Sequence, residues 1–207
     1  MTALAVVGVL LAAALGVWWT TSLRWQVYPR NFAAVDRNHL YRSGQISARL
    51  IEPTLSRYGI DTVVFMSTDN LQRADVRAEI DACNRLGIRR VNLPLGGDGT
   101  GNPDRYVQAL LEIHRARLAG QQILVHCHTG SQRTGGVVAL YRVLLEGWSA
   151  TAARDELIDF GHDPSENPRL IPYLNEHLPY IASKLVEAGV LQRMPDPMPR
   201  FELPSGR

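Results

Sequence analysis

The sequence is poor in the residues that build disulfide frameworks and metal sites. It has two cysteines among 207 residues, Cys83 and Cys127, and no Cys or His pair has zinc-type spacing. A disulfide framework is therefore excluded, and we expect no metal and no other cofactor. The formal net charge is only +2, and Lys184 is the only lysine. These totals give no reason to expect a nucleic-acid partner.

Long hydrophobic runs are also scarce, and the one present lies at residues 3–19, ending in Trp18 and Trp19. This length is at the short end of the about 17–25 residues that cross a bilayer as a helix. A cleaved signal peptide is the alternative, but residues 1–2 supply no basic region. We therefore expect a transmembrane anchor over residues 1–22.

Basic residues follow this run and none precedes it, the first ones being Arg24, Arg30, Arg37 and Arg42. Under the positive-inside rule, this asymmetry predicts a single-pass membrane protein whose main domain faces the cytoplasm. We expect a connector over residues 23–37 between the anchor and that domain.

The hydrophobic pattern after the connector predicts one α/β domain over residues 38–190. Short β-branched runs predict strands near 39–43, 61–67, 88–95 and 122–127. Helical spacing predicts helices over 48–58, 71–86, 103–118, 135–145, 149–160 and 167–188. Pro53 and Pro179 are expected to disturb the first and the last of these helices. The fold class is thus a small central sheet, mostly parallel, with helices on both faces.

Proline is concentrated after this domain, at positions 195, 197, 199 and 204. We therefore expect residues 191–207 to form a Pro-rich tail that is disordered or lies loosely on the surface.

Residues 125–135, Val-His-Cys-His-Thr-Gly-Ser-Gln-Arg-Thr-Gly, join the strand at 122–127 to the next helix. A strand, a tight loop and a helix N-terminus in this order make an anion site, because the loop amides and the first helical N–H groups point at one spot. A positive field there should lower the pKa of Cys127 and give a thiolate nucleophile. Arg133 is spaced so that its guanidinium can return to the loop and bind two phosphoryl oxygens.

The motif His126-Cys127-x5-Arg133-Thr134 resembles the signature loop of the cysteine-based protein tyrosine and dual-specificity phosphatases. The segment 41–45, Tyr-Arg-Ser-Gly-Gln, resembles the opening of their compact bacterial, fungal and plant-type members. The resemblance covers residues 38–188 and implies a dual-specificity phosphatase-like fold that acts through a phosphocysteine.

The same resemblance assigns roles within the loop. Cys127 would be the nucleophile and Arg133 a catalytic phosphate ligand. His126 would support the thiolate geometry, and Thr134 would donate its hydroxyl to the sulfur. The remaining loop residues would bind phosphate mainly through their backbone amides: His128, Thr129, Gly130, Ser131 and Gln132.

Phosphoryl transfer to a thiolate also needs an acid that protonates the leaving group. In the resembled family this acid is an aspartate on a mobile loop some thirty residues before the cysteine, and Asp98 in the Gly-rich segment 96–101 fits that place. Asp104 has an ordinary role at a helix start, where it favours the helix dipole. Two other possibilities remain open: Asp69 could be the acid, or the site could have no dedicated acid. No Trp-Pro pair precedes Asp98, so the loop differs from that of the large tyrosine-specific enzymes.

We expect the substrate to be a phosphomonoester, with phosphotyrosine in proteins first and phosphoserine or phosphothreonine as further candidates. A phosphoinositide or inositol-phosphate phosphatase is an alternative, although no lysine lies inside the loop to support it. A non-catalytic phosphate-binding module is a second alternative, which intact Cys127 and Arg133 oppose. Cys83 falls on the apolar stripe of the helix expected at 71–86, where it is either a small buried hydrophobe or a resolving thiol for Cys127.

Overall fold

The computed structural model describes residues 10, 13, 16, 24–37 and 39–202. The transmembrane anchor expected over residues 1–22 therefore lies almost entirely outside the described residues. No helix in the described part is both long and apolar enough to cross a membrane. This finding contradicts the expected single-pass membrane location with a cytoplasmic domain, and we withdraw that prediction.

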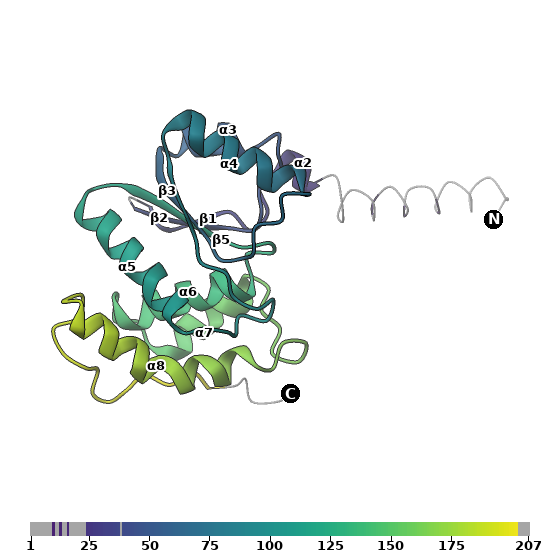
Figure 1. The fold of residues 1–207 in the computed structure, drawn as a ribbon. Helices are drawn as coiled ribbons and strands as arrows, with labels where there is room; N and C mark the ends of the chain where they lie inside the picture. Colours follow the sequence, from purple (N-terminus) through teal and green to yellow (C-terminus); the bar gives the residue numbers. More distant parts are fainter. Residues whose placement is uncertain (1–9, 11–12, 14–15, 17–23, 38, 203–207) are drawn as a thin grey trace.

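A five-stranded sheet forms the centre of the described chain (Figure 1). Its strands are β1 (Ala33–Asp36), β2 (Leu40–Ser43), β3 (Ile60–Phe65), β4 (Arg89–Asn92) and β5 (Gln122–His126), in the spatial order β1-β2-β5-β3-β4. All neighbours are parallel except β1, which pairs antiparallel with β2. The mostly parallel sheet is confirmed. The edge strand β1 was missed because it is four residues long and lies in the segment assigned to the connector.

The helices cover both faces of the sheet, as expected. In Figure 1, α3 (Ile51–Arg57) and α4 (Ala74–Leu86) lie on one face, beside the short α2 (Arg24–Val27). The other face carries α5 (Asp104–Leu118), α6 (Gln132–Leu144), α7 (Ala150–Asp159) and α8 (Leu170–Glu187).

Successive strand residues alternate between these two layers. On β3, Val63 packs into the core cluster beneath α3 and α4, whereas Val64 packs into the larger cluster beneath α5 to α8. This alternation follows from the period of two of a strand. A near-continuous apolar strand is therefore what a sheet covered on both faces requires.

The two helix prolines affect their helices less than the sequence predicts. The helix α3 begins at Ile51, so Pro53 lies in the first turn, where its missing N–H leaves no intrahelical bond unmade. Pro179 lies inside α8, which continues through it as one helix. Leu178 and Ile181 on either side are fully buried, so tertiary packing outweighs the local loss.

The Pro-rich tail is anchored as far as residue 202. Phe201 is only 1% exposed and belongs to the main core cluster. Its backbone N–H donates to the Asn175 side chain at 2.8 Å, and its carbonyl accepts from the same amide at 2.8 Å. The described part of the tail is thus packed on α8 rather than loose.

Candidate active site

The cysteine loop lies where the carboxyl ends of β2, β3 and β5 meet the N-terminus of α6. Cys127 follows β5 directly, and α6 begins at Gln132, so Arg133 lies in the first helical turn. The Gly130 N–H donates to the Cys127 sulfur at 3.3 Å. The chain therefore curls around the thiol and brings the helix N-terminus to it, as the motif predicts.

The surroundings of Cys127 favour the thiolate. Burial alone would raise the pKa of the thiol, but the Thr134 hydroxyl, the Arg133 charge and the backbone N–H groups of Thr134 and Gly130 together lower it below its ordinary value. The Thr134 hydroxyl is buried and has no hydrogen-bond partner among the described residues besides its interaction with the Cys127 sulfur. These are the interactions that make a cysteine nucleophilic near neutral pH.

Three consecutive loop carbonyls are tied to residues outside the loop. The carbonyls of His128, Thr129 and Gly130 accept, respectively, from the Gln45 backbone N–H at 3.0 Å, the Asn31 side chain at 2.9 Å and the Arg42 guanidinium at 2.7 Å. In a trans peptide group, the carbonyl of one residue and the N–H of the next residue point in opposite directions. Holding the carbonyls outward therefore directs the loop amides inward, which suits an anion.

Two glycines let β2 and the loop approach each other this closely. A Cβ on Gly44 would lie 2.8 Å from the Thr129 carbonyl oxygen, and one on Gly130 would lie 2.7 Å from the Gly44 nitrogen. Gly130 also has a φ of +79°, which L side chains rarely adopt. Glycine is required at both positions.

Arg42 lies beneath the loop and is fully buried. Its guanidinium packs 3.8 Å from the centroid of the Phe160 ring, and its Nε and Nη1 have no hydrogen-bond partner in the described structure. Burial lowers its pKa to about 10, with Glu156 and Cys127 acting in the opposite direction, so the side chain remains charged at neutral pH. Arg42 is therefore a structural cation that holds the loop from inside the fold.

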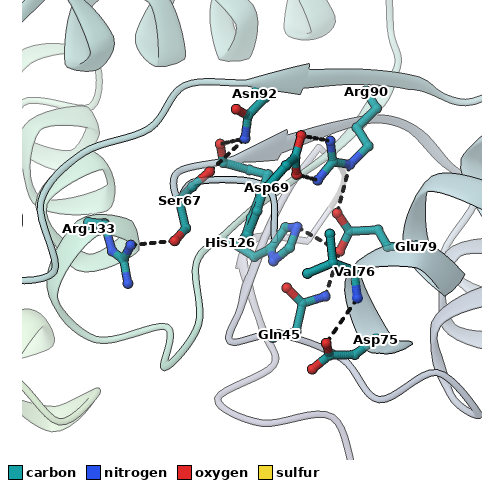
Figure 2. A network of polar contacts seen from close by, with 11 residues as sticks. Gln45, Ser67, Asp69, Asp75, Val76, Glu79, Arg90, Asn92, His126 and Arg133 are labelled. Carbon is teal, nitrogen blue, oxygen red and sulfur yellow. Dashed lines mark hydrogen bonds and ion pairs between the residues drawn. The ribbon is translucent and has the colours of Figure 1, made fainter. Parts of the chain in front are cut away.

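Arg133 is held by the end of β3. Its Nη1 donates to the Ser67 hydroxyl at 2.6 Å, and the Ser67 carbonyl accepts from the Asn92 side chain at 2.7 Å (Figure 2). Ser67 was not among the site residues that the sequence predicted. The available signal was its position as a polar residue at the carboxyl end of a buried parallel strand, where such ends collect ligand-binding groups.

A buried network of charged side chains lies behind His126 (Figure 2). Its Nε2 is 3.0 Å from a carboxylate oxygen of Glu79, which is fully buried on α4. Glu79 also accepts from Arg90 at 2.9 Å and from the Gln45 side chain at 3.0 Å. Burial would raise the pKa of Glu79, but the His126 ring and the Arg90 guanidinium outweigh it and lower the value to about 2. His126 is thus anchored by a permanent carboxylate.

The three candidate acids lie in different environments. Asp69 is bound by both terminal nitrogens of Arg90, at 2.6 and 3.1 Å, and Asp104 accepts from the Tyr180 hydroxyl at 2.5 Å. Asp98 accepts from the backbone N–H and the hydroxyl of Thr100 at 3.0 and 2.8 Å. Its other oxygen is 3.0 Å from the largely exposed Arg169.

Asp98 and Cys127 both act electrostatically on Tyr106. Burial raises the pKa of Tyr106 well above its ordinary value, and the negative charges of both Cys127 and Asp98 raise it further. The Tyr106 hydroxyl donates to the carbonyl of Gly99 at 2.7 Å, and this bond holds the Asp98 loop beside α6. Burial would raise the pKa of Asp98, but the Thr100 bonds and Arg169 lower it, so the carboxyl is ionised in this conformation.

The sequence matches a known protein family over most of its length. The model described as "Tyrosine phosphatase family" matches residues 26–177. The chain belongs to the tyrosine phosphatase family. A curated relative is the dual specificity protein phosphatase TpbA of Pseudomonas aeruginosa strain UCBPP-PA14, 30% identical over 130 residues. This match covers 63% of the chain, which spans only 55% of that relative.

Solved structures of phosphatases have the same fold. A crystal structure of P. aeruginosa TpbA superposes with a TM-score of 0.58 at 24% identity, covering 71% of this chain and 84% of that one. A TpbA variant in complex with pTyr gives a TM-score of 0.54 at 25% identity, covering 69% and 87%. The catalytic core of the PP-IP phosphatase SIW14 from S. cerevisiae gives 0.58 at 22% identity, covering 75% and 93%.

Two further loop residues, Gln132 and Ser131, lie at the start of α6. Gln132 and His162 are both buried and contact each other at 2.5 Å, between side-chain oxygen and ring nitrogen. Ser131 occupies the N-cap position of α6, but its side chain makes no capping hydrogen bond. Cys83 belongs to the core cluster beneath α3 and α4, whereas Cys127 belongs to the other cluster. Burial and Glu79 raise the pKa of Cys83 to about 12, which opposes a role as a resolving thiol.

No group of three or more His, Cys, Asp or Glu side chains within residues 24–37 and 39–202 is arranged to hold a metal ion.

Proposed function

We propose that this chain is a cysteine-dependent phosphatase that hydrolyses phosphate monoesters through a phosphocysteine intermediate. The observation that carries the proposal is the thiol of Cys127, whose pKa is lowered inside a loop with its carbonyls tied outward. A phosphoryl group bound in that loop meets inward amides and Arg133 on one side and the sulfur on the other. This arrangement suits in-line attack at phosphorus.

In the first step the Cys127 thiolate forms a bond to phosphorus as the bond to the leaving oxygen breaks. Arg133 exchanges its Ser67 contact for two phosphoryl oxygens and stabilises the charge of the transition state. Asp98 gives its proton to the leaving oxygen. Because Thr100 and Arg169 keep Asp98 ionised in the present conformation, the loop carrying it must shift on substrate binding for the carboxyl to hold a proton.

In the second step water attacks the phosphocysteine and Asp98, now a carboxylate, accepts a proton from it. The Thr134 hydroxyl donates to the departing sulfur. His126, fixed by Glu79, supports the loop throughout and takes no part in proton transfer.

Phosphotyrosine in proteins is the substrate class that we propose first. TpbA has been crystallised with pTyr, and curated TpbA is a dual specificity phosphatase, which makes phosphoserine and phosphothreonine further candidates. SIW14, with the same fold, is a PP-IP phosphatase, so inositol phosphates form the alternative class.

Turnover assays on a phosphotyrosine peptide, a phosphothreonine peptide and a soluble phosphoinositide test this proposal. We expect the wild type to release phosphate fastest from the phosphotyrosine peptide. Cys127→Ser should abolish release, whereas Cys83→Ser, the matched control, should retain it. Full activity in Cys127→Ser would refute the mechanism, and no release from any substrate by the wild type would favour the non-catalytic module.

A further inference from the structure

A polar cavity of about 160 Å³ lies beside the cysteine loop. It is open to solvent and is lined by the segment from α2 to β1, the turn after β2, the N-terminus of α4 and His128 of the loop. A second cavity of about 410 Å³ shares Gln26, Ser47, Arg73 and Asp75 with it and reaches the first turn of α4. His128 thus lies between this cavity and the mouth of the proposed phosphate site, and none of the roles above uses the cavity.

Arg30 supplies an uncompensated positive charge to this cavity. Its side chain is half-buried, and its guanidinium makes no ion pair or hydrogen bond with the described residues. It lies 5.4 Å from the centroid of the Trp25 ring, which is another lining residue. A half-buried arginine without a carboxylate is unusual and favours an anion as its missing partner.

The backbone fixes Arg30 relative to the loop. Its carbonyl accepts from the Gly44 N–H at 2.7 Å. The next residue, Asn31, has a φ of +48° and donates to the Thr129 carbonyl. Asparagine is one of the few non-glycine residues that adopt this left-handed conformation readily. Arg30 is therefore held at a set place beside the phosphate loop.

Arg73 supplies the second cation. It binds Asp75 through Nε at 3.0 Å and Nη2 at 2.6 Å, which leaves Nη1 without a hydrogen bond. Counting Arg30, Arg73 and Asp75, the lining carries one net positive charge. Burial, together with Arg133 and Arg73, lowers the pKa of His128. Its ring is therefore uncharged at neutral pH and does not change the net charge of the lining.

Three polar atoms of the lining are buried and unpartnered in the described structure: Gln45 Oε1, Ser47 Oγ and His128 Nδ1. Buried polar groups are normally hydrogen-bonded, so three such atoms on residues around one cavity favour a polar occupant nearby. Together with the two arginines, these atoms suit an anion with hydroxyl or amide groups next to it.

We propose that this cavity is an anion subsite, which binds a second phosphate or carboxylate on the substrate molecule whose scissile phosphate lies over Cys127. The inference rests on the proposed function, because it names a preference of that same site. It assigns Arg30 and Arg73 to substrate selection and predicts that phosphomonoesters with a neighbouring anionic group are better substrates than those without one.

The test compares kcat/KM for substrates that carry one or two anionic groups. Phenyl phosphate is the single-anion substrate. Phenylene bisphosphate carries the second group on a small molecule, and a phosphotyrosine peptide with an adjacent glutamate carries it on a peptide. The ratio of kcat/KM for a two-anion substrate to that for phenyl phosphate should exceed one. In Arg30→Gln this ratio should fall about tenfold, the effect of losing one charged hydrogen bond, and Arg73→Gln should lower it in the same direction.

Arg24→Gln is the matched control, because Arg24 lies in the same segment and packs 4.0 Å from the Trp25 ring centroid without lining the cavity. It should keep the wild-type ratio. Whichever two-anion substrate shows the larger dependence on Arg30 identifies the source of the second anion. A ratio that does not change in Arg30→Gln would overturn the subsite.

Calorimetric binding of phenylene bisphosphate to Cys127→Ser separates this inference from the proposed function. A dissociation constant that weakens about tenfold on adding Arg30→Gln supports the subsite even if no substrate turns over. Binding that is indifferent to Arg30 overturns the subsite even if the chain is an active phosphatase.

Discussion

Replacing Glu79 by Gln removes one negative charge from behind the cysteine loop while keeping the side-chain shape. In the native chain this fully buried carboxylate is 3.0 Å from His126 and 2.9 Å from Arg90. The neutral amide of Gln supplies no negative charge to pair with either partner. Breaking a buried ion pair by removing one partner typically costs about 3–5 kcal/mol, because the other charge is left buried.

The pKa of Glu79 gives an independent magnitude for its contribution to the stability of the fold, and it predicts how that contribution depends on pH. Its depression from 4.5 to about 2 corresponds to about 3 kcal/mol of stabilisation of the ionised form. Because the folded-state pKa is the lower one, this stabilisation is complete above about pH 4.5 and declines as the pH falls toward 2. At pH 3.5 about 1 kcal/mol of it is already lost.

Urea unfolding of the wild type and Glu79→Gln at pH 7 and pH 3.5 measures both quantities. We expect the free energy of unfolding of Glu79→Gln to be about 3 kcal/mol lower than that of the wild type at pH 7. This gap between the two proteins should narrow at pH 3.5. Glu52→Gln is the control, since Glu52 forms an exposed ion pair with Arg85, and exposed pairs contribute little. A gap that is absent at pH 7, or that widens on acidification, would refute the assigned charge state of Glu79.

Three further outcomes follow from the site geometry. Arg42→Met removes the cation bound to the Gly130 carbonyl, so the pH at which iodoacetamide alkylates Cys127 should rise; an unchanged profile would contradict this role. Asp98→Asn should lower kcat on a phosphotyrosine peptide by about 10²-fold or more and have less effect on p-nitrophenyl phosphate, whose leaving group needs less protonation. A similar loss in Asp104→Asn but not in Asp98→Asn would reassign the acid. Arg169→Ala removes a charge that lowers the pKa of Asp98, so the basic limb of the kcat/KM profile should move to higher pH.

The sequence was most informative where structure and chemistry are local. The strand, loop and helix around Cys127 follow one another within a single motif, so their order and the position of Arg133 could be predicted from spacing alone. The Ser149 cap of α7, which accepts from the Ala152 N–H at 3.2 Å, is equally local. Each of these features depends on residues a few positions apart.

Residues that reach the loop from distant segments could not be predicted in this way. Asn31, Ser67 and Glu79 lie far along the chain from the cysteine, and no periodicity shows that their side chains converge on it. Tertiary packing likewise decides that α8 continues through Pro179 and that Phe201 is buried. Local proline rules predicted a break and a loose tail because they contain no information about these partners.

The most direct test of the central claim is to trap the covalent intermediate. Rapid acid quenching of the wild type during turnover of a phosphotyrosine peptide, followed by peptide mass spectrometry, should reveal one phosphoryl group on the peptide that contains Cys127. With p-nitrophenyl phosphate, whose leaving group needs less protonation, Asp98→Asn should slow hydrolysis of this intermediate and increase its amount, and Cys127→Ser should show none on sulfur. Turnover at the wild-type rate with no phosphoryl group on Cys127 under any quench condition would contradict the account.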